Sequence, residues 1–217
     1  MSITKYGYDV VITGALVVVI GCLLSLNFVE WKPLRIVLLS ALLTLFILTL
    51  TFFRDPERST PQGDSLVISP ADGTVVVIKD AHEDEYMQAE AIQVSIFMSP
   101  LDVHVNRYPI SGTVNYFKHI HGEFGVAYEE KSSLRNEQTH IGIENENFRV
   151  LFKQIAGFIA RRIVAPIHVG DVAVAGERFG MIRFGSRVDV FVPKSAELKV
   201  KVGDKTVAGE TVVAVVS

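Results

Sequence analysis

Two long apolar stretches without charge, near the start of the chain, constrain its fold more than any other feature. They span residues 10–29 (VVITGALVVVIGCLLSLNFV) and residues 36–53 (IVLLSALLTLFILTLTFF). At a rise of about 1.5 Å per residue, helices of these lengths each cover roughly the 30 Å hydrocarbon core of a bilayer. The intervening EWKPLR is charged and contains a proline, which suits a tight reversal at the interface. We therefore predict a membrane hairpin of two hydrophobic helices over residues 1–53.

Two alternatives to this hairpin are a cleavable signal peptide and a helical pair buried in a globular domain. The first stretch lacks the basic leading region of a signal peptide, and the second stretch follows too soon. The lengths of both stretches also favour a membrane over a core. Basic residues are more numerous outside the hairpin than in its link: Lys5, Arg54 and Arg58 against Lys32 and Arg35. This bias predicts a cell-membrane protein whose large polar domain lies on the cytoplasmic side.

Cysteine content and charge exclude several classes of function. The single cysteine, Cys22, lies within the first apolar stretch. A disulfide framework, a Cys-ligated zinc site and a cysteine nucleophile in the polar region are therefore excluded. The net charge of −3 comes without a basic block that could neutralise phosphates, so nucleic acid is not an expected partner.

The rest of the chain has the pattern of a β-rich domain. Residues 54–64, RDPERSTPQGD, are rich in proline, glycine and charge, and they are predicted to form a linker. Residues 65–217 consist of short β-branched or aromatic runs separated by Gly, Pro, Asp and Asn, without sustained helical periodicity. We therefore predict strands throughout residues 65–217.

Two sequence echoes predict internal symmetry in this domain. GDVAVAGE at residues 170–177 recurs as GDKTVAGE at 203–210, and PADGTV at 70–75 recurs loosely as PISGTV at 109–114. In each echo Gly and Asp supply a turn and the following Val resumes a strand. Such units are typical of the barrel-sandwich of lipoyl and biotinyl domains. The predicted fold class is mainly β, a barrel-sandwich-like (lipoyl/biotinyl-like) domain behind an N-terminal transmembrane helical hairpin.

Three segments place polar groups among apolar strands. In SPADGTV, Asp72 precedes a glycine, which is also typical of an ordinary turn. In IFMSPLDVHVNRYP, Asp102 and His104 are two residues apart and share a strand face, so the acid could orient the imidazole, although a structural histidine fits equally well. In MIRFGSRVDVF, Gly185-Ser186 interrupts a good strand.

The Gly185-Ser186 pair allows two interpretations. A β-bulge or hairpin would accommodate a small flexible pair. Alternatively, the Ser186 hydroxyl could attack the carbonyl of Gly185, the nearest acyl group, and convert the amide to an ester. Glycine at the preceding position permits the close approach and unusual dihedral angles that this attack requires.

In this order behind a hydrophobic leader, SPADG, FMSPLDVHVNR and FGSRVDVF closely resemble the short prokaryotic form of phosphatidylserine decarboxylase, over essentially residues 54–217. The resemblance implies a proenzyme that cuts itself between Gly185 and Ser186. The products would be a β chain of residues 1–185 and an α chain of residues 186–217 capped by a pyruvoyl group made from Ser186. The pyruvoyl group would form a Schiff base with phosphatidylserine and accept the electrons released with carbon dioxide, which gives phosphatidylethanolamine without a metal.

The resemblance also implies roles for individual residues. Asp72 matches the acid of the self-cleavage triad, and His104 matches the first histidine of a D-x-H-x-x-H segment that is linked to decarboxylation. Arg107 stands where the second histidine would be, so the base that activates the serine is left open between His104, His140 and His121. Arg107 could instead bind the lipid phosphate.

The expected partners are phosphatidylserine in the membrane and the two chains for one another, and a homo-oligomer is left open. A membrane-anchored barrel-sandwich adaptor without enzymatic activity is the alternative function, although such adaptors usually insert a long helical hairpin with heptads, which is not visible here. A lipoyl-type carrier would need a lysine at a hairpin tip, whereas Lys199 and Lys201 alternate along a strand.

Overall fold

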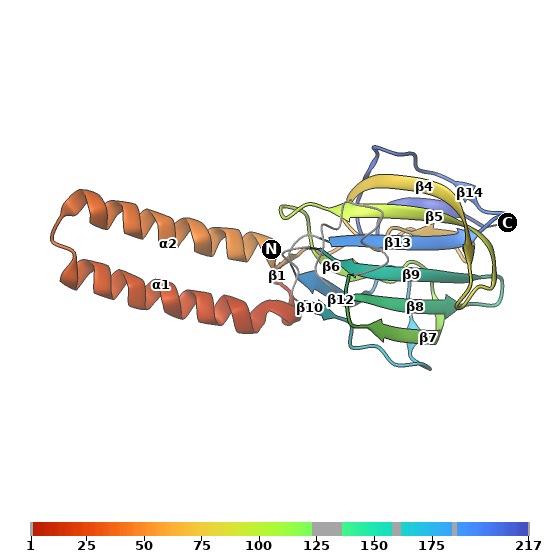
Figure 1. Cartoon of the computed structure of the whole chain (residues 1–217), viewed down its shortest axis with the longest axis horizontal. Helices are drawn as coiled ribbons and strands as arrows, with labels where there is room; N and C mark the ends of the chain where they lie inside the picture. Colours follow the sequence, from red (N-terminus) through yellow and green to blue (C-terminus); the bar gives the residue numbers. More distant parts are fainter. Residues whose placement is uncertain (1, 123–135, 158–161, 184–185, 217) are drawn as a thin grey trace. The chain divides into compact units, whose positions relative to one another are not determined.

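The computed structural model describes residues 2–122, 136–157, 162–183 and 186–216 (Figure 1). The chain divides into two compact units, Met1–Pro56 and Glu57–Ser217. The cut site predicted from the sequence falls partly outside the description, because Gly185 is not among the described residues. Each unit is described by itself below.

The first unit is a pair of long apolar helices. Its elements are β1 (Ser2–Ile3), the 3-10 helix η1 (Lys5–Gly7), α1 (Tyr8–Phe28), α2 (Lys32–Phe52) and β2 (Arg54–Asp55), and β1 pairs with β2. Segments Lys5–Phe28 and Lys32–Phe52 are long and apolar enough to cross a membrane, and very little of either is buried inside the protein. A helical pair inside a globular core would be covered by protein, so this exposure favours a bilayer as the surrounding medium.

The second unit is built from strands, and its described residues contain no α-helix. Its strands are β3 (Leu66–Ile68), β4 (Gly73–Glu83), β5 (Ala89–Met98), β6 (Val105–Arg107), β7 (Gly112–Ile120), β8 (Gln138–Glu144), β9 (Arg149–Ala156), β10 (Arg162–Val164), β11 (Val172–Ala173), β12 (Arg178–Arg183), β13 (Ser186–Pro193), β14 (Glu197–Leu198), β15 (Lys205–Thr206) and β16 (Val212–Val215). The prediction of a mainly β domain is thus confirmed.

A curled eight-stranded sheet with the order β11-β7-β8-β9-β13-β5-β4-β15 dominates this unit (Figure 1). Two three-stranded sheets, β10-β12-β6 and β14-β16-β3, complete it. The main core collects alternate residues of the large sheet, such as Val188 and Val190 of β13, with Ile182 of β12 and Val213 of β16. The more specific likeness to a lipoyl-type barrel-sandwich stays a prediction.

The sequence echoes coincide with repeated turn geometry. Gly170 and Gly203 open the two longer echoes with φ angles of 99° and 96°, in the left-handed region that glycine tolerates. Their N–H groups donate to the carbonyls of Val114 and Val75, each at 2.8 Å, and these valines close the two shorter echoes. The same turn therefore closes both edges of the large sheet, where β11 pairs with β7 and β15 pairs with β4.

Candidate active site

Strand pairing brings the three polar motifs to one end of the large sheet. Ser186 opens β13 and pairs with Met98 at the end of β5 on one side, and with the last residue of β9 on the other. Gly73 opens β4, whose second residue pairs with Phe97 of β5. Asp72 precedes Gly73, and the loop with Asp102 follows the end of β5. The motifs therefore lie beside the end of this one central strand.

Ser186 is fully buried in the sheet, with 0% exposure. It continues the alternation of Val188, Val190 and Val192, so its side chain lies on the core face. Its hydroxyl donates to the thioether sulfur of Met98 at an Oγ–Sδ distance of 3.3 Å. Because a thioether is a weak acceptor, this contact holds the hydroxyl only loosely.

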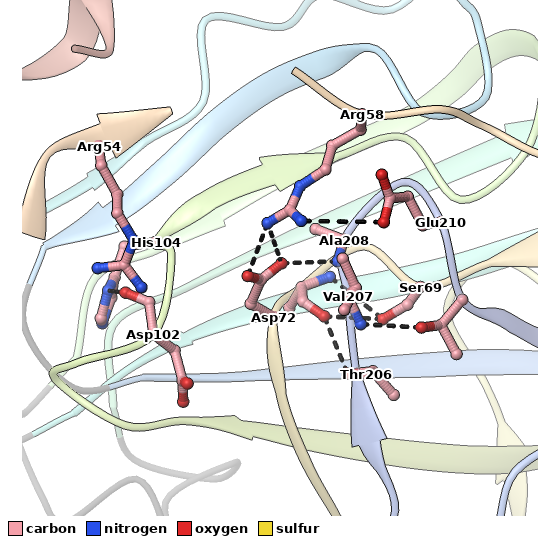
Figure 2. Close-up of polar contacts among 12 residues, drawn as sticks. Arg54, Arg58, Ser69, Asp72, Asp102, His104, Thr206, Val207, Ala208 and Glu210 are labelled. Atoms are coloured by element: carbon pink, nitrogen blue, oxygen red, sulfur yellow. Dashed lines mark hydrogen bonds and ion pairs between the residues drawn. The ribbon is translucent and has the colours of Figure 1, made fainter. Parts of the chain in front are cut away.

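Asp72 is held by a cation from the start of the second unit (Figure 2). One Nη atom of Arg58 lies 3.1 and 2.8 Å from the two carboxylate oxygens, and the Ala208 N–H donates to the carboxylate at 2.7 Å. Burial raises the pKa of Asp72, while the Ala208 N–H and the Arg58 charge act in the opposite direction. The Asp72 carboxylate is therefore held by an arginine side chain and a backbone amide.

His104 is fully buried, and a backbone carbonyl fixes its ring (Figure 2). Its Nδ1 lies 2.9 Å from the carbonyl oxygen of Asp102, so Nδ1 carries the proton that is donated there. The Asp102 carboxylate instead accepts the Ser99 N–H at 2.8 Å. The sequence left open whether the Asp102 carboxylate orients this histidine, and in the structure the main-chain carbonyl of Asp102 makes the contact. In this tautomer Nε2 is the basic nitrogen.

A family model described as phosphatidylserine decarboxylase matches residues 45–214. The chain belongs to the phosphatidylserine decarboxylase family. It is 50% identical to a phosphatidylserine decarboxylase proenzyme of Chlorobium phaeovibrioides over 175 residues. This match covers 81% of this chain and 80% of the relative. Proenzymes of Chlorobium phaeobacteroides and Cytophaga hutchinsonii are 42% and 43% identical over 211 and 216 residues, and each comparison covers at least 97% of both chains.

Arg107, which stands at the second histidine position of the decarboxylase segment, is buried at 5% exposure. Its Nη1 donates to the carbonyl of Gly176 at 2.8 Å. Its Cδ lies 2.8 Å from where a Cβ at Gly209 would be, so the side chain packs closely on this glycine. These contacts tie Arg107 to a glycine in each of the two longer echoes.

His140 lies on the other face of the sheet from the Ser186 side chain. Its strand neighbours Ile141 and Ile143 are in the main core, and the adjacent Thr139 bonds to a core-facing glutamine, so alternation puts His140 on the opposite face of the sheet, where it is still buried. Its Nδ1 lies 2.5 Å from a Glu85 carboxylate oxygen. Burial and the nearby Lys153 lower the pKa of His140, against the opposing effect of Glu85.

His121 follows the end of β7, and its ring centre lies 4.6 Å from that of His119. It is exposed, and strands β8 and β9 lie between β7 and the strand that Ser186 opens, β13. The structure thus groups Asp72, His104 and Ser186 around the end of β5. Neither His121 nor His140 joins this group.

A buried polar chain beside Ser186 is a feature that the sequence analysis missed. The Asn106 Nδ2 lies 3.7 Å from the Met98 sulfur and donates to the Pro70 carbonyl at 3.3 Å. Its Oδ1 accepts from Gln154 at 2.8 Å, and Gln154 accepts from Thr139 at 2.6 Å. A polar residue at an inward position of an apolar strand, as Gln154 is in FRVLFKQIAG, was the available signal.

Replacing Arg58 by glutamine is expected to destabilise the folded domain. The change removes the charge that faces the Asp72 carboxylate, whose side chain is only 15% exposed. Loss of the partner of a largely buried charged group should cost roughly 1–3 kcal/mol and raise the pKa of Asp72 further. Thermal unfolding in detergent micelles measures the effect. Arg178→Gln is the matched control, because Arg178 pairs with the exposed Glu57 and should change little. Equal shifts for both variants would contradict the prediction.

Proposed function

We propose that this chain is a membrane-associated proenzyme that cuts itself between Gly185 and Ser186 and then decarboxylates phosphatidylserine to phosphatidylethanolamine. The observation that carries the proposal is the position of Ser186. This residue opens a central strand and pairs with the last residue of β5, the strand end near which Asp72 and the His104 loop also lie. It belongs to a chain that shares 50% identity over 175 residues with a phosphatidylserine decarboxylase proenzyme.

Self-cleavage would begin with attack of the Ser186 hydroxyl on the Gly185 carbonyl carbon. The peptide C–N bond breaks, its nitrogen takes a proton, and an ester forms. Removal of the Ser186 α-proton then expels the Gly185 carboxylate, which keeps the serine oxygen. The dehydroalanine that is left takes up water and releases ammonia, which leaves a pyruvoyl group at the new chain start. The group would supply an electron sink for the loss of carbon dioxide.

The surroundings of Ser186 fit a small uncharged keto group. The residue is fully buried, and its side chain meets the thioether of Met98, a polarisable neighbour that accepts a hydroxyl weakly and packs equally well against a methyl. Exclusion of water at this position would protect a reactive carbonyl. We therefore assign the pyruvoyl group to residue 186, with no requirement for a metal.

The two chains would stay together after the cut because their strands pair with one another. This happens both in the large sheet and in the sheet β14-β16-β3. Strand β13 pairs over most of its length with β5 and β9, both from the β chain. Further along the α chain, β15 pairs with β4 and β16 pairs with β3. Sheet pairing of this extent needs no covalent link.

Within this proposal His104 is the base and Asp72 is a positioning group. The fixed tautomer of His104 presents Nε2 as a proton acceptor, which suits removal of a proton from the serine hydroxyl or protonation of the lipid product carbon. Arg58 and the Ala208 N–H hold the Asp72 carboxylate in one place. Asp72 would then place its carboxylate at a fixed position near the end of β5.

The apolar helical pair would bring the enzyme to its lipid. Each methylene that leaves a membrane for water costs about 0.8 kcal/mol, so extraction of a diacyl lipid is unfavourable. An anchored enzyme avoids that extraction. The bias of basic residues supports a cytoplasmic position for the catalytic unit.

Borohydride reduction in the presence of phosphatidylserine tests the proposal. When the lipid is supplied in vesicles, phosphatidylserine should become covalently attached to the α chain alone, since the lipid amine would condense with the carbonyl at residue 186. Vesicles of phosphatidylglycerol, which has no amine, are the control. Mass spectrometry of the two chains locates the adduct. Attachment to the β chain would exclude Ser186 as the source of the carbonyl.

A further inference from the structure

The buried polar chain of Thr139, Gln154 and Asn106 ends beside the residue at which cleavage is proposed. Asn106 of β6 and Gln154 of β9 are fully buried, and Thr139 of β8 is nearly so. The Thr139 hydroxyl donates to Gln154 Oε1 at 2.6 Å, and Gln154 Nε2 donates to Asn106 Oδ1 at 2.8 Å. The hydrogen bonds therefore run in one direction and lead to the amide nitrogen of Asn106.

The last contact of this chain fixes its direction. Asn106 Nδ2 lies 3.3 Å from the carbonyl oxygen of Pro70, and a carbonyl oxygen can only accept. The NH2 end of Asn106 must therefore face Pro70, which turns Oδ1 toward Gln154 and sets the orientation of both amides. Side chains from three strands thus hold one amide nitrogen in a single place.

Among the residues that the structure describes, this nitrogen meets only weak acceptors. The Pro70 carbonyl already accepts the Arg107 N–H at 3.0 Å. The second acceptor is the thioether sulfur of Met98, 3.7 Å from Asn106 Nδ2, and a thioether accepts weakly. A buried donor usually has a good acceptor, because a poorly used one lowers stability. Asn106 therefore retains hydrogen-bonding capacity that the folded proenzyme leaves largely unused.

This capacity lies against the same atom as the Ser186 hydroxyl. Ser186 Oγ lies 3.3 Å from the Met98 sulfur, which is the sulfur that Asn106 Nδ2 contacts. Strand register agrees with this placement, because Gln154 pairs with Val188, two residues along β13 from Ser186, and Val188 is in the main core. The polar chain and the Ser186 side chain therefore share the core face of the large sheet.

We propose that Asn106 donates a hydrogen bond to the oxygen that becomes negative during self-cleavage, an inference that rests on the proposed function and adds a residue to its first step. As Ser186 Oγ bonds to the Gly185 carbonyl carbon, the hydroxyl proton passes to a base and the C=O electron pair moves onto the carbonyl oxygen. Collapse of this adduct breaks the C–N bond, and the Ser186 nitrogen takes up a proton.

A donor fixed in advance is well suited to this step. Only one carbon atom separates the charged oxygen from the Ser186 nitrogen, so the negative charge develops next to the residue that Asn106 approaches. An amide N–H that is already oriented and shielded from water stabilises an oxyanion without further reorganisation. Gln154 and Thr139 are then positioning residues, because they act through Asn106.

The rate of self-cleavage tests this assignment, since it is measured on the proenzyme and needs no lipid turnover. Pulse–chase labelling of the full chain, made by cell-free synthesis with nanodiscs, follows the conversion of one chain into two. Asn106→Leu keeps the approximate shape but has no donor, and it should slow conversion at least about 100-fold, the usual effect of losing one oxyanion donor. Gln154→Leu should slow conversion less, because the Asn106 amide is still present but is held less firmly.

Gln93→Leu is the matched control. Gln93 is also a buried amide on a central strand, but it donates to Ser95 and Asp189 on the other face of the sheet. This substitution should leave the conversion rate unchanged. Unfolding midpoints in an uncut Ser186→Ala background show whether each substituted chain folds. Equal slowing by Asn106→Leu and Gln93→Leu, or conversion of Asn106→Leu at the parental rate, would overturn the assignment.

Asn106→Asp gives a second test that does not depend on the leucine variant. Burial should raise the pKa of the new carboxyl, which is charged at high pH and offers an O–H donor once it is protonated. Its conversion rate relative to the parent should therefore rise at least about ten-fold from pH 8 to pH 5.5. A constant ratio would contradict the assignment and leave the proposed function standing. A parent chain that is never converted into two would instead remove the proposed function.

Discussion

A Ser186→Ala variant is expected to remain a single chain of 217 residues and to release no carbon dioxide from phosphatidylserine. Alanine lacks the hydroxyl that would attack the Gly185 carbonyl, so the ester cannot form and the carbonyl at residue 186 never arises. The backbone pairing of β13 with β5 and β9 does not depend on this oxygen. The variant should therefore fold normally. Intact-mass measurement distinguishes one chain from two.

Ser95→Ala is the matched control for this prediction. Ser95 is equally buried, lies on β5 opposite Asp189 of β13, and accepts a hydrogen bond from Gln93 at 3.0 Å. Its replacement removes one buried hydroxyl from the same part of the sheet, with no acyl group assigned to it. This variant should still be found as two chains. A Ser186→Ala protein that is cut like the parent would end the proposed chemistry.

The helical pair and the β-rich domain were predictable from the sequence for local reasons. An uncharged stretch of 18 to 20 apolar residues has few stable states other than a membrane helix, and its length can be read directly. The echo turns were also visible, because a left-handed turn such as that at Gly170 selects glycine. Such features depend on neighbouring residues alone.

The contacts of the candidate site were less predictable because they depend on strand register. Arg58 and Asp72 are 14 positions apart, and the Ala208 amide that completes the cradle lies 136 positions from Asp72. No local pattern selects these partners. Sequence periodicity likewise assigns a histidine to a strand but leaves open which face of that strand meets the core.

His104 and His140 illustrate this limit most clearly. The family resemblance left both open as the base for Ser186, because Arg107 stands where the family has a second histidine. Pairing across the sheet places His140 on the face opposite to the Ser186 side chain, whereas His104 lies in the loop beyond β5, beside which Ser186 begins its strand. The two histidines should therefore respond differently to substitution.

His104→Ala is expected to lower decarboxylation at least about 100-fold, the usual contribution of a positioned acid–base group. His140→Ala should be cut and should turn over lipid like the parent. Cleavage yield by mass and carbon dioxide release are scored separately for each variant. A His140→Ala protein that stays uncut, beside a His104→Ala protein that is cut, would reverse the assignment of the base for self-cleavage.

His140 should instead influence stability at neutral pH through Glu85, which gives its variant a phenotype of its own. Burial alone would raise the pKa of Glu85, but hydrogen bonds from His140, Lys118 and Tyr116 outweigh it and lower the pKa to about 2. A carboxyl whose folded pKa is depressed stabilises the fold above its unfolded value, near 4.5, and loses that contribution as the pH falls toward 2. Without His140 the folded pKa moves back toward 4.5, so the Glu85 contribution shrinks at neutral pH and less remains to be lost in acid. The thermal unfolding midpoint of His140→Ala should therefore lie below that of the parent at pH 7, and the two midpoints should lie closer together at pH 3. Activity at neutral pH should be retained.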